Sequence, residues 1–125
     1  MKKKVLYFGN ETMPSDRAAI EAVNRIEHSL PGIDFIHCNS PDEIVRYGNE
    51  DFFVLDVAKN VDGLLVFDDP DKIKERKISS LHDFDLGFFL KLLKKMRDRT
   101  FRVIAIPPEK KCDSELIELL KSYEI

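Results

Sequence analysis

The sequence has few of the residues that mark disulfide-rich or zinc-stabilised domains. Two of its 125 residues are cysteine, Cys38 and Cys112, and they show no C-x-x-C spacing. This pattern disfavours a zinc site or a disulfide framework. We expect both cysteines to have packing roles in a reducing compartment.

Long apolar runs are also missing. The opening "MKKKVLYFGN" begins with basic residues, but its apolar run is short and ends at Gly9 and Asn10. Such a run is too short for a signal-peptide core or for a membrane-spanning helix. We therefore expect a cytoplasmic protein with no membrane partner.

The chain has no excess of positive charge, since its formal net charge is −3. The basic residues occur in short blocks that are interrupted by, or adjoin, acidic or apolar residues. A protein that binds nucleic acid usually concentrates basic residues on one face. We therefore expect no nucleic-acid partner.

What the sequence does contain is enough apolar material for one core. Hydrophobic residues make up 43% of the chain and include nine Phe. A chain of this length is typical of one domain. We expect a single α/β domain spanning residues 1–125.

Five short apolar runs rich in Val, Ile and Phe predict strands, namely "KVLYF", "IDFIHC", "DFFVLDVA", "GLLVF" and "FRVIAI". Helical spacing follows over 15–30, from Pro41 with Ser40 as N-cap and Glu43 in a capping box, over 86–96 after Asp85, and after Asp113 as N-cap. Alternating strands and helices predict an α/β/α sandwich, with a mostly parallel sheet of about five strands and helices on both faces. The short "KNVD" connection predicts an antiparallel hairpin between the third and fourth strands.

Three polar residues follow or end predicted strands, where open α/β sheets bind ligands. Asp16 opens the first helix, Asp56 interrupts an apolar run, and His82 lies in the long connection over 68–85. Asp16 alone is better explained as a carboxylate that stabilises a helix start. Together the three residues form an N,O,O set that suits zinc or nickel. His37 is a weaker metal candidate, and we expect His28 to face solvent.

The order of these motifs resembles the hydrogenase maturation endopeptidases. The resemblance rests on a strand ending in "GN", an acid opening a helix, "VLDVA", "LHDFDLGFFLKLL", and "VIAIPPE" before a closing helix. It implies a single α/β/α domain and a metal-dependent, aspartic-type maturation endopeptidase. Such an enzyme removes the C-terminal extension of a nickel-iron hydrogenase large-subunit precursor, and the nickel is carried by that precursor. Asp16, Asp56 and His82 match the family's metal-contacting and catalytic positions, and zinc or cadmium is the expected substitute metal in vitro.

Two other functions remain open. The family usually has paired acids followed by glycines at the first helix, whereas this chain reads "SDRAA", with Arg17 expected to obstruct or reshape access. This difference motivates a non-catalytic relative that binds a metalloprotein partner or a metal. The second is a small-ligand or nucleotide-binding α/β domain, which is disfavoured because the chain lacks the G-x-G-x-x-G turn and the phosphate-loop pattern.

Overall fold

The computed structural model describes residues 3–9, 17–39, 41–47, 51–59, 61–67, 79–80, 102–108 and 110–123. In chain order its elements are β1 (Lys3–Phe8), α1 (Ala18–Ile26), the 3-10 helix η2 (Glu27–Ser29), β2 (Ile33–Cys38), the 3-10 helix η3 (Pro41–Tyr47), β3 (Phe52–Lys59), β4 (Leu65–Phe67), β5 (Ser79–Ser80), β6 (Arg102–Ile106) and α4 (Asp113–Tyr123). The five predicted strands correspond to β1, β2, β3, β4 and β6. The helix predicted over 86–96 lies outside the described residues.

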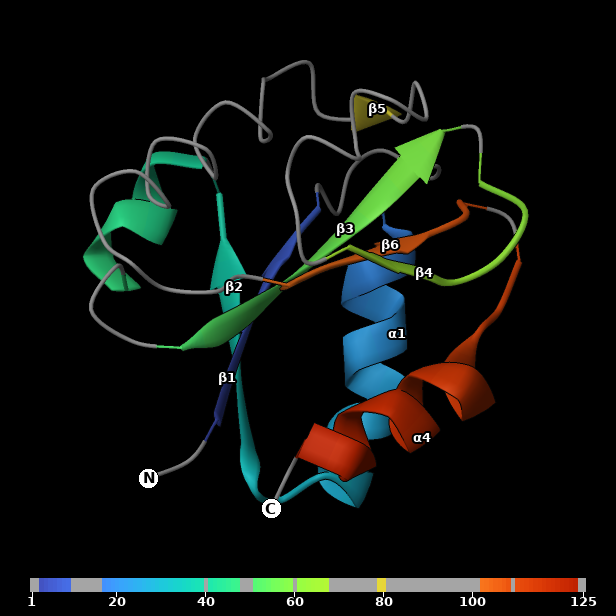
Figure 1. The fold of residues 1–125 in the computed structure, drawn as a ribbon, viewed down its shortest axis with the longest axis horizontal. Helices are drawn as coiled ribbons and strands as arrows, with labels where there is room; N and C mark the ends of the chain where they lie inside the picture. Colours follow the sequence, from blue (N-terminus) through green and yellow to red (C-terminus); the bar gives the residue numbers. More distant parts are fainter. Residues whose placement is uncertain are drawn as a thin grey trace.

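The described strands form one sheet with the order β2-β1-β3-β6-β4, and β5 pairs with β3 beside this path (Figure 1). β1, β2, β3 and β6 are parallel to one another, whereas β4 runs antiparallel to β6. The predicted α/β class, with a mostly parallel sheet and an antiparallel strand, is confirmed.

The predicted hairpin between β3 and β4 is wrong in its pairing. β6 lies between the two strands, so that Leu65 of β4 pairs with Ala105 of β6, and Leu55 of β3 pairs with Ile104. The connection between β3 and β4 therefore crosses over the place that β6 occupies. β6 pairs in parallel with β3 and antiparallel with β4, an arrangement that the short connection alone does not reveal.

The helices differ from prediction at their ends. The predicted helix over 15–30 is α1 followed by η2, and the helix from Pro41 is a 3-10 helix. Glu43 accepts a hydrogen bond from the backbone N–H of Asn39, one residue before the predicted cap.

At the start of α4, the backbone N–H of Leu116 donates to the carbonyl of Cys112. Asp113 is thus the first residue of α4 and not the cap, and its carboxylate is bound by a residue of α1.

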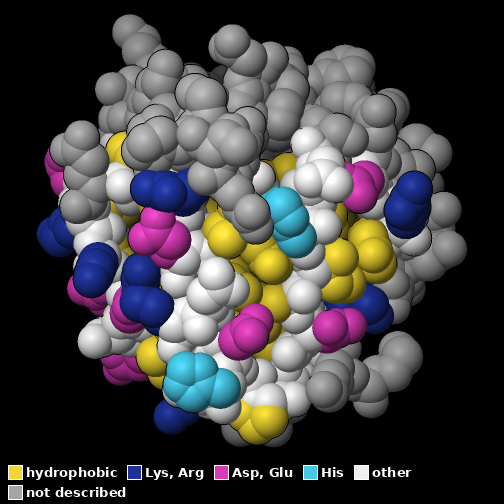
Figure 2. All heavy atoms as spheres, turned by 180° about the vertical axis from the view of Figure 1, so that it is seen from behind, with side chains coloured by type: hydrophobic (Ala, Val, Ile, Leu, Met, Phe, Trp, Pro, Cys, Tyr) yellow, Lys and Arg dark blue, Asp and Glu magenta, His cyan; other side chains and the backbone are white. Residues whose placement is uncertain are grey.

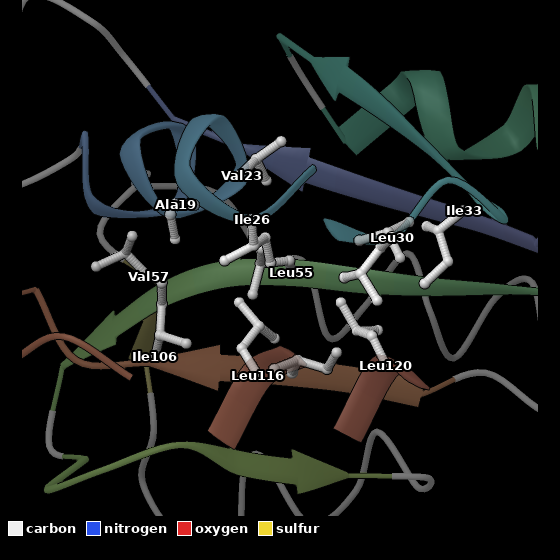
Figure 3. Packing of buried hydrophobic residues seen from close by; sticks show 13 residues of the cluster. Ala19, Val23, Ile26, Leu30, Ile33, Leu55, Val57, Ile106, Leu116 and Leu120 are labelled. Carbon is white, nitrogen blue, oxygen red and sulfur yellow. The ribbon is translucent and has the colours of Figure 1, made fainter. Parts of the chain in front are cut away.

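The two faces of the sheet are covered differently. On one face, Leu55 and Val57 of β3 pack against α1 and α4, in a cluster that includes Val23 and Leu116 (Figure 3). On the other face, alternate strand residues such as Val54 join a cluster that includes Ile44 of η3. This alternation follows from the two-residue period of a strand.

Among the described residues, no helix is long and apolar enough to cross a membrane.

Candidate functional site

The sheet has a switch point between β1 and β3. From β1 the chain passes through α1 to β2 on one side, and from β3 it passes to β4 on the other side. The connections that leave the carboxyl ends of β1 and β3 therefore diverge there. In open α/β sheets ligands bind in the crevice at such a point.

Asp56 lies in the carboxyl half of β3, next to this switch point. Its exposed fraction is 3%, and in the part of the chain that the structure describes it is the buried charged residue of the core. Its Oδ1 accepts a hydrogen bond from the backbone N–H of Val57 at 2.9 Å. By strand alternation its side chain lies on the face that carries Val54, opposite the face covered by α1 and α4.

The other two predicted metal ligands, Asp16 and His82, lie outside the described residues. The convergence of Asp16, Asp56 and His82 therefore stays a prediction. The described residues alone contain no group of three His, Cys, Asp or Glu side chains that could hold a metal ion.

Arg17, expected to obstruct or reshape the site, lies along the exposed side of α1. Its Nε is 3.5 Å from Oε1 of Glu21, one helical turn away, and both side chains are about half exposed, at 46% and 51%. An ion pair of this spacing is typical of a solvated helix surface. The guanidinium is therefore directed along the helix toward Glu21.

His37 has a contact that the sequence did not reveal. Its ring stacks on that of Tyr7, with centroids 5.1 Å apart, and its Nε2 lies 3.0 Å from the carbonyl oxygen of Gly9. The carbonyl is an acceptor, so Nε2 must carry a proton and donate. A protonated Nε2 does not bind a metal, which disfavours His37 as a ligand through this atom. The contact instead fixes the backbone just after β1. His28 is exposed, as predicted.

Both cysteines are free and buried, which agrees with the predicted packing roles. Burial, with a smaller effect of the Glu43 carboxylate, raises the pKa of the Cys38 thiol to about 11. Burial also raises the pKa of Cys112. Both side chains are therefore neutral thiols at neutral pH, whereas nucleophilic and metal-binding cysteines are thiolates.

A hollow of about 230 Å³ lies between α1 and the connection from β6 to α4. One wall is a two-point ion pair in which Nε and Nη2 of Arg25 donate to the carboxylate of Asp113, at 2.6 and 2.9 Å. The hydrogen bond from Arg25 lowers the pKa of Asp113, and the same bond raises that of Arg25. The two residues are 88 positions apart, and no local pattern in the sequence predicts their contact.

Comparison with family models gives no match, and comparison with curated protein sequences gives none either. Two solved structures resemble the fold along almost its whole length. An uncharacterized protein from Wolinella succinogenes matches with a TM-score of 0.65 and 13% identity, over 99% of this chain and 97% of that one. The [NiFe] hydrogenase maturation protease HycI from Thermococcus kodakarensis KOD1 matches with a TM-score of 0.63 and 12% identity, over 98% of this chain and 90% of that one. At these identities the likeness shows a shared fold.

Proposed function

We propose that the protein is a cytoplasmic endopeptidase that removes the C-terminal extension of a nickel-loaded [NiFe] hydrogenase large-subunit precursor. The observation that carries the proposal is the buried Asp56 at the switch point of a fold shared with a hydrogenase maturation protease. The order of sequence motifs around Asp16, Asp56 and His82 supports the same function.

Asp56 suits a role toward a cation. A buried carboxylate is costly unless a hydrogen-bond donor, a cation or a metal stabilises its charge. The hydrogen bond from the backbone N–H of Val57 is one contact that stabilises this charge. Carboxylate oxygen together with imidazole nitrogen is a ligand set that nickel and zinc accept.

In this proposal Asp16, Asp56 and His82 contact the nickel that the precursor brings, so that the metal is part of the substrate. The bound metal supplies Lewis acidity toward the scissile carbonyl or a water molecule. The chain's own residues hold the precursor in register at the carboxyl edge of the sheet. The hydrogen bond from His37 to Gly9 fixes the start of the connection that carries Asp16.

The direct test is processing of a nickel-loaded precursor, followed by the change in its mass. We expect Asp16→Ala, Asp56→Ala and His82→Ala each to abolish shortening. The matched controls Asp34→Ala and His28→Ala remove an exposed acid and an exposed histidine, and should process normally.

Two results would count against the proposal. If the three site variants cut the precursor as well as the controls do, the assigned residues are wrong. If the unaltered protein binds the precursor without shortening it, the protein is a binding relative and not a protease.

A further inference from the structure

The hollow between α1 and the β6–α4 connection is large enough for one small chemical group of a ligand. Its volume of about 230 Å³ is below the roughly 300 to 1,000 Å³ of sites for drug-sized ligands. Its walls come from three parts of the fold: Ala18 and Ala22 of α1, Ile106 at the end of β6, and Lys110 and Lys111 before α4.

The acidic residues that line the hollow are already paired. Asp113 accepts both hydrogen bonds from Arg25, and Glu21 lies 3.5 Å from Arg17 and 3.9 Å from Arg25. In these ion pairs the charges of the two carboxylates and of the two arginines neutralise one another.

The two lysines differ from these residues. Lys110 and Lys111 are exposed, and the structure records no ion pair between either of them and another described residue. On the face seen in Figure 2, basic and acidic side chains of the described residues are interspersed. The sequence also places Glu109 in this connection, outside the described residues. Lys111 acts on the Asp113 carboxylate only as the smallest of the causes that lower its pKa. Both lysines thus add positive charge at the rim of the hollow.

The hollow and Asp56 share one edge of the sheet. Asp56 pairs with Ala105, the residue before Ile106, on a neighbouring strand about 4.8 Å away. Ile106 belongs to the face covered by the helices, whereas Asp56 lies on the other face. The hollow therefore lies near Asp56 along the sheet, but on the opposite face.

We propose that this hollow binds a carboxylate of a peptide, held by Lys110 and Lys111. A carboxylate is small enough for the volume and opposite in charge to the lysines, which act as compact, hydrated point charges. That the peptide is the segment of the precursor next to the cleavage point rests on the proposed function. The binding of the carboxylate itself does not.

The test uses three matched probes on the uniformly 15N-labelled protein, followed by amide chemical shifts. N-acetyl-glutamic acid α-amide carries a side-chain carboxylate, N-acetyl-glutamine carries a terminal carboxylate, and N-acetyl-glutamine amide carries none. We expect at least one carboxylate probe to shift the amides of Ala18, Ala22 and Lys110–Asp113, and the uncharged probe to leave them in place. The probe that acts identifies which kind of carboxylate the hollow accepts.

The Lys110→Ala/Lys111→Ala double variant should weaken this binding about tenfold, because each exposed pair contributes a factor of a few. Raising the salt concentration from 0.05 to about 0.5 M should weaken it in the unaltered protein, since exposed charges are screened. Lys121→Ala removes an exposed lysine of α4 that does not line the hollow, and serves as the control.

Equal shifts from all three probes, no shift from any of them, or full binding by the double variant would overturn the inference. These outcomes are independent of proteolysis, because no precursor is present. If the unaltered protein binds the carboxylate probe as expected but does not cut the precursor, only the proposed function is overturned.

Discussion

The two faces of the central sheet differ in what they bury. The face covered by α1 and α4 is lined by Leu55, Val57 and other apolar residues, and the two helices are joined by the Arg25–Asp113 ion pair. The opposite face has an apolar cluster of its own but also carries Asp56, at 3% exposed. One face is thus closed by two helices that an ion pair joins, whereas the other face holds the buried charge.

The largest expected effect comes from removing a matched leucine from each face. Leu55 and Leu6 are both fully buried, on β3 and β1. We expect Leu55→Ala to lower the free energy of unfolding by about 4 kcal/mol and Leu6→Ala by about 3 kcal/mol. The reason is that the cavity left by Leu55→Ala lies under two helices joined by an ion pair. These helices should relax into it less than the opposite face relaxes into the cavity left by Leu6→Ala. Urea denaturation measures both values, and a larger loss for Leu6→Ala would contradict the greater rigidity expected of the helix-covered face.

The next effect separates stability from activity at Asp56. Asp56→Asn keeps the shape and the oxygen that accepts from Val57 but removes the charge. We expect the free energy of unfolding to stay within about 1 kcal/mol. If the proposed function holds, precursor processing should fall by about 100-fold, because the carboxylate then contacts the metal of the precursor and such a contact contributes several kcal/mol. A large loss of stability with normal processing would make Asp56 a structural residue.

A smaller effect is expected for the ion pair that joins the helices. Arg25 and Asp113 are about one third exposed, at 34% and 28%, so solvent screening limits what Arg25→Met costs to about 1 kcal/mol at pH 7. The pKa of Asp113 is lower in the folded protein than its ordinary value of 3.8. The stabilisation is therefore present above about pH 4 and is lost as pH falls through the folded pKa.

Unfolding of the unaltered protein and of Arg25→Met at pH 7 and at about pH 2.5 checks the sign. The difference between the two proteins should shrink in acid. If it grows, the pair does not act through the ionised carboxylate.

The smallest effect concerns the cysteines, because we expect almost no reaction in the native protein. With a pKa of about 11, Cys38 is a thiolate in about one molecule in a thousand at pH 8. Cys112 is slightly more exposed, at 6% against 1%. A disulfide reagent should therefore label Cys112 before Cys38, and mass spectrometry of the labelled peptides shows the order. Cys112→Ser should leave the remaining labelling close to zero.

Much of this fold could be predicted from short apolar runs. The runs around Leu6 and Leu55 fixed the identity of the strands, since four to eight β-branched and aromatic residues are too few for a buried helix. The pairing of β4 could not be predicted, because it depends on β6, which is distant in the sequence. The Arg25–Asp113 contact is hidden for the same reason.

For the candidate site the sequence was informative at one position. An acid inside an apolar run is unusual, and Asp56 is indeed buried. The role of His37 could not be predicted, because its partner is a backbone carbonyl at Gly9 and not a side chain with a recognisable spacing. The convergence of Asp16 and His82 on Asp56 remains a prediction.

The position of β6 between β3 and β4 has a consequence for synthesis of the chain. While the ribosome has made β3 and β4 but not yet residues 102–106, the edge of β3 that β6 will occupy is open, and β4 is tethered to β3 by residues 60–64. Closing so short a loop costs less entropy than waiting for a distant strand. We expect the nascent chain to form the β3–β4 hairpin first, and that hairpin must then open to admit β6. On this expectation the last strand enters the sheet by displacing a local partner, and we expect its entry to be the slow step of folding.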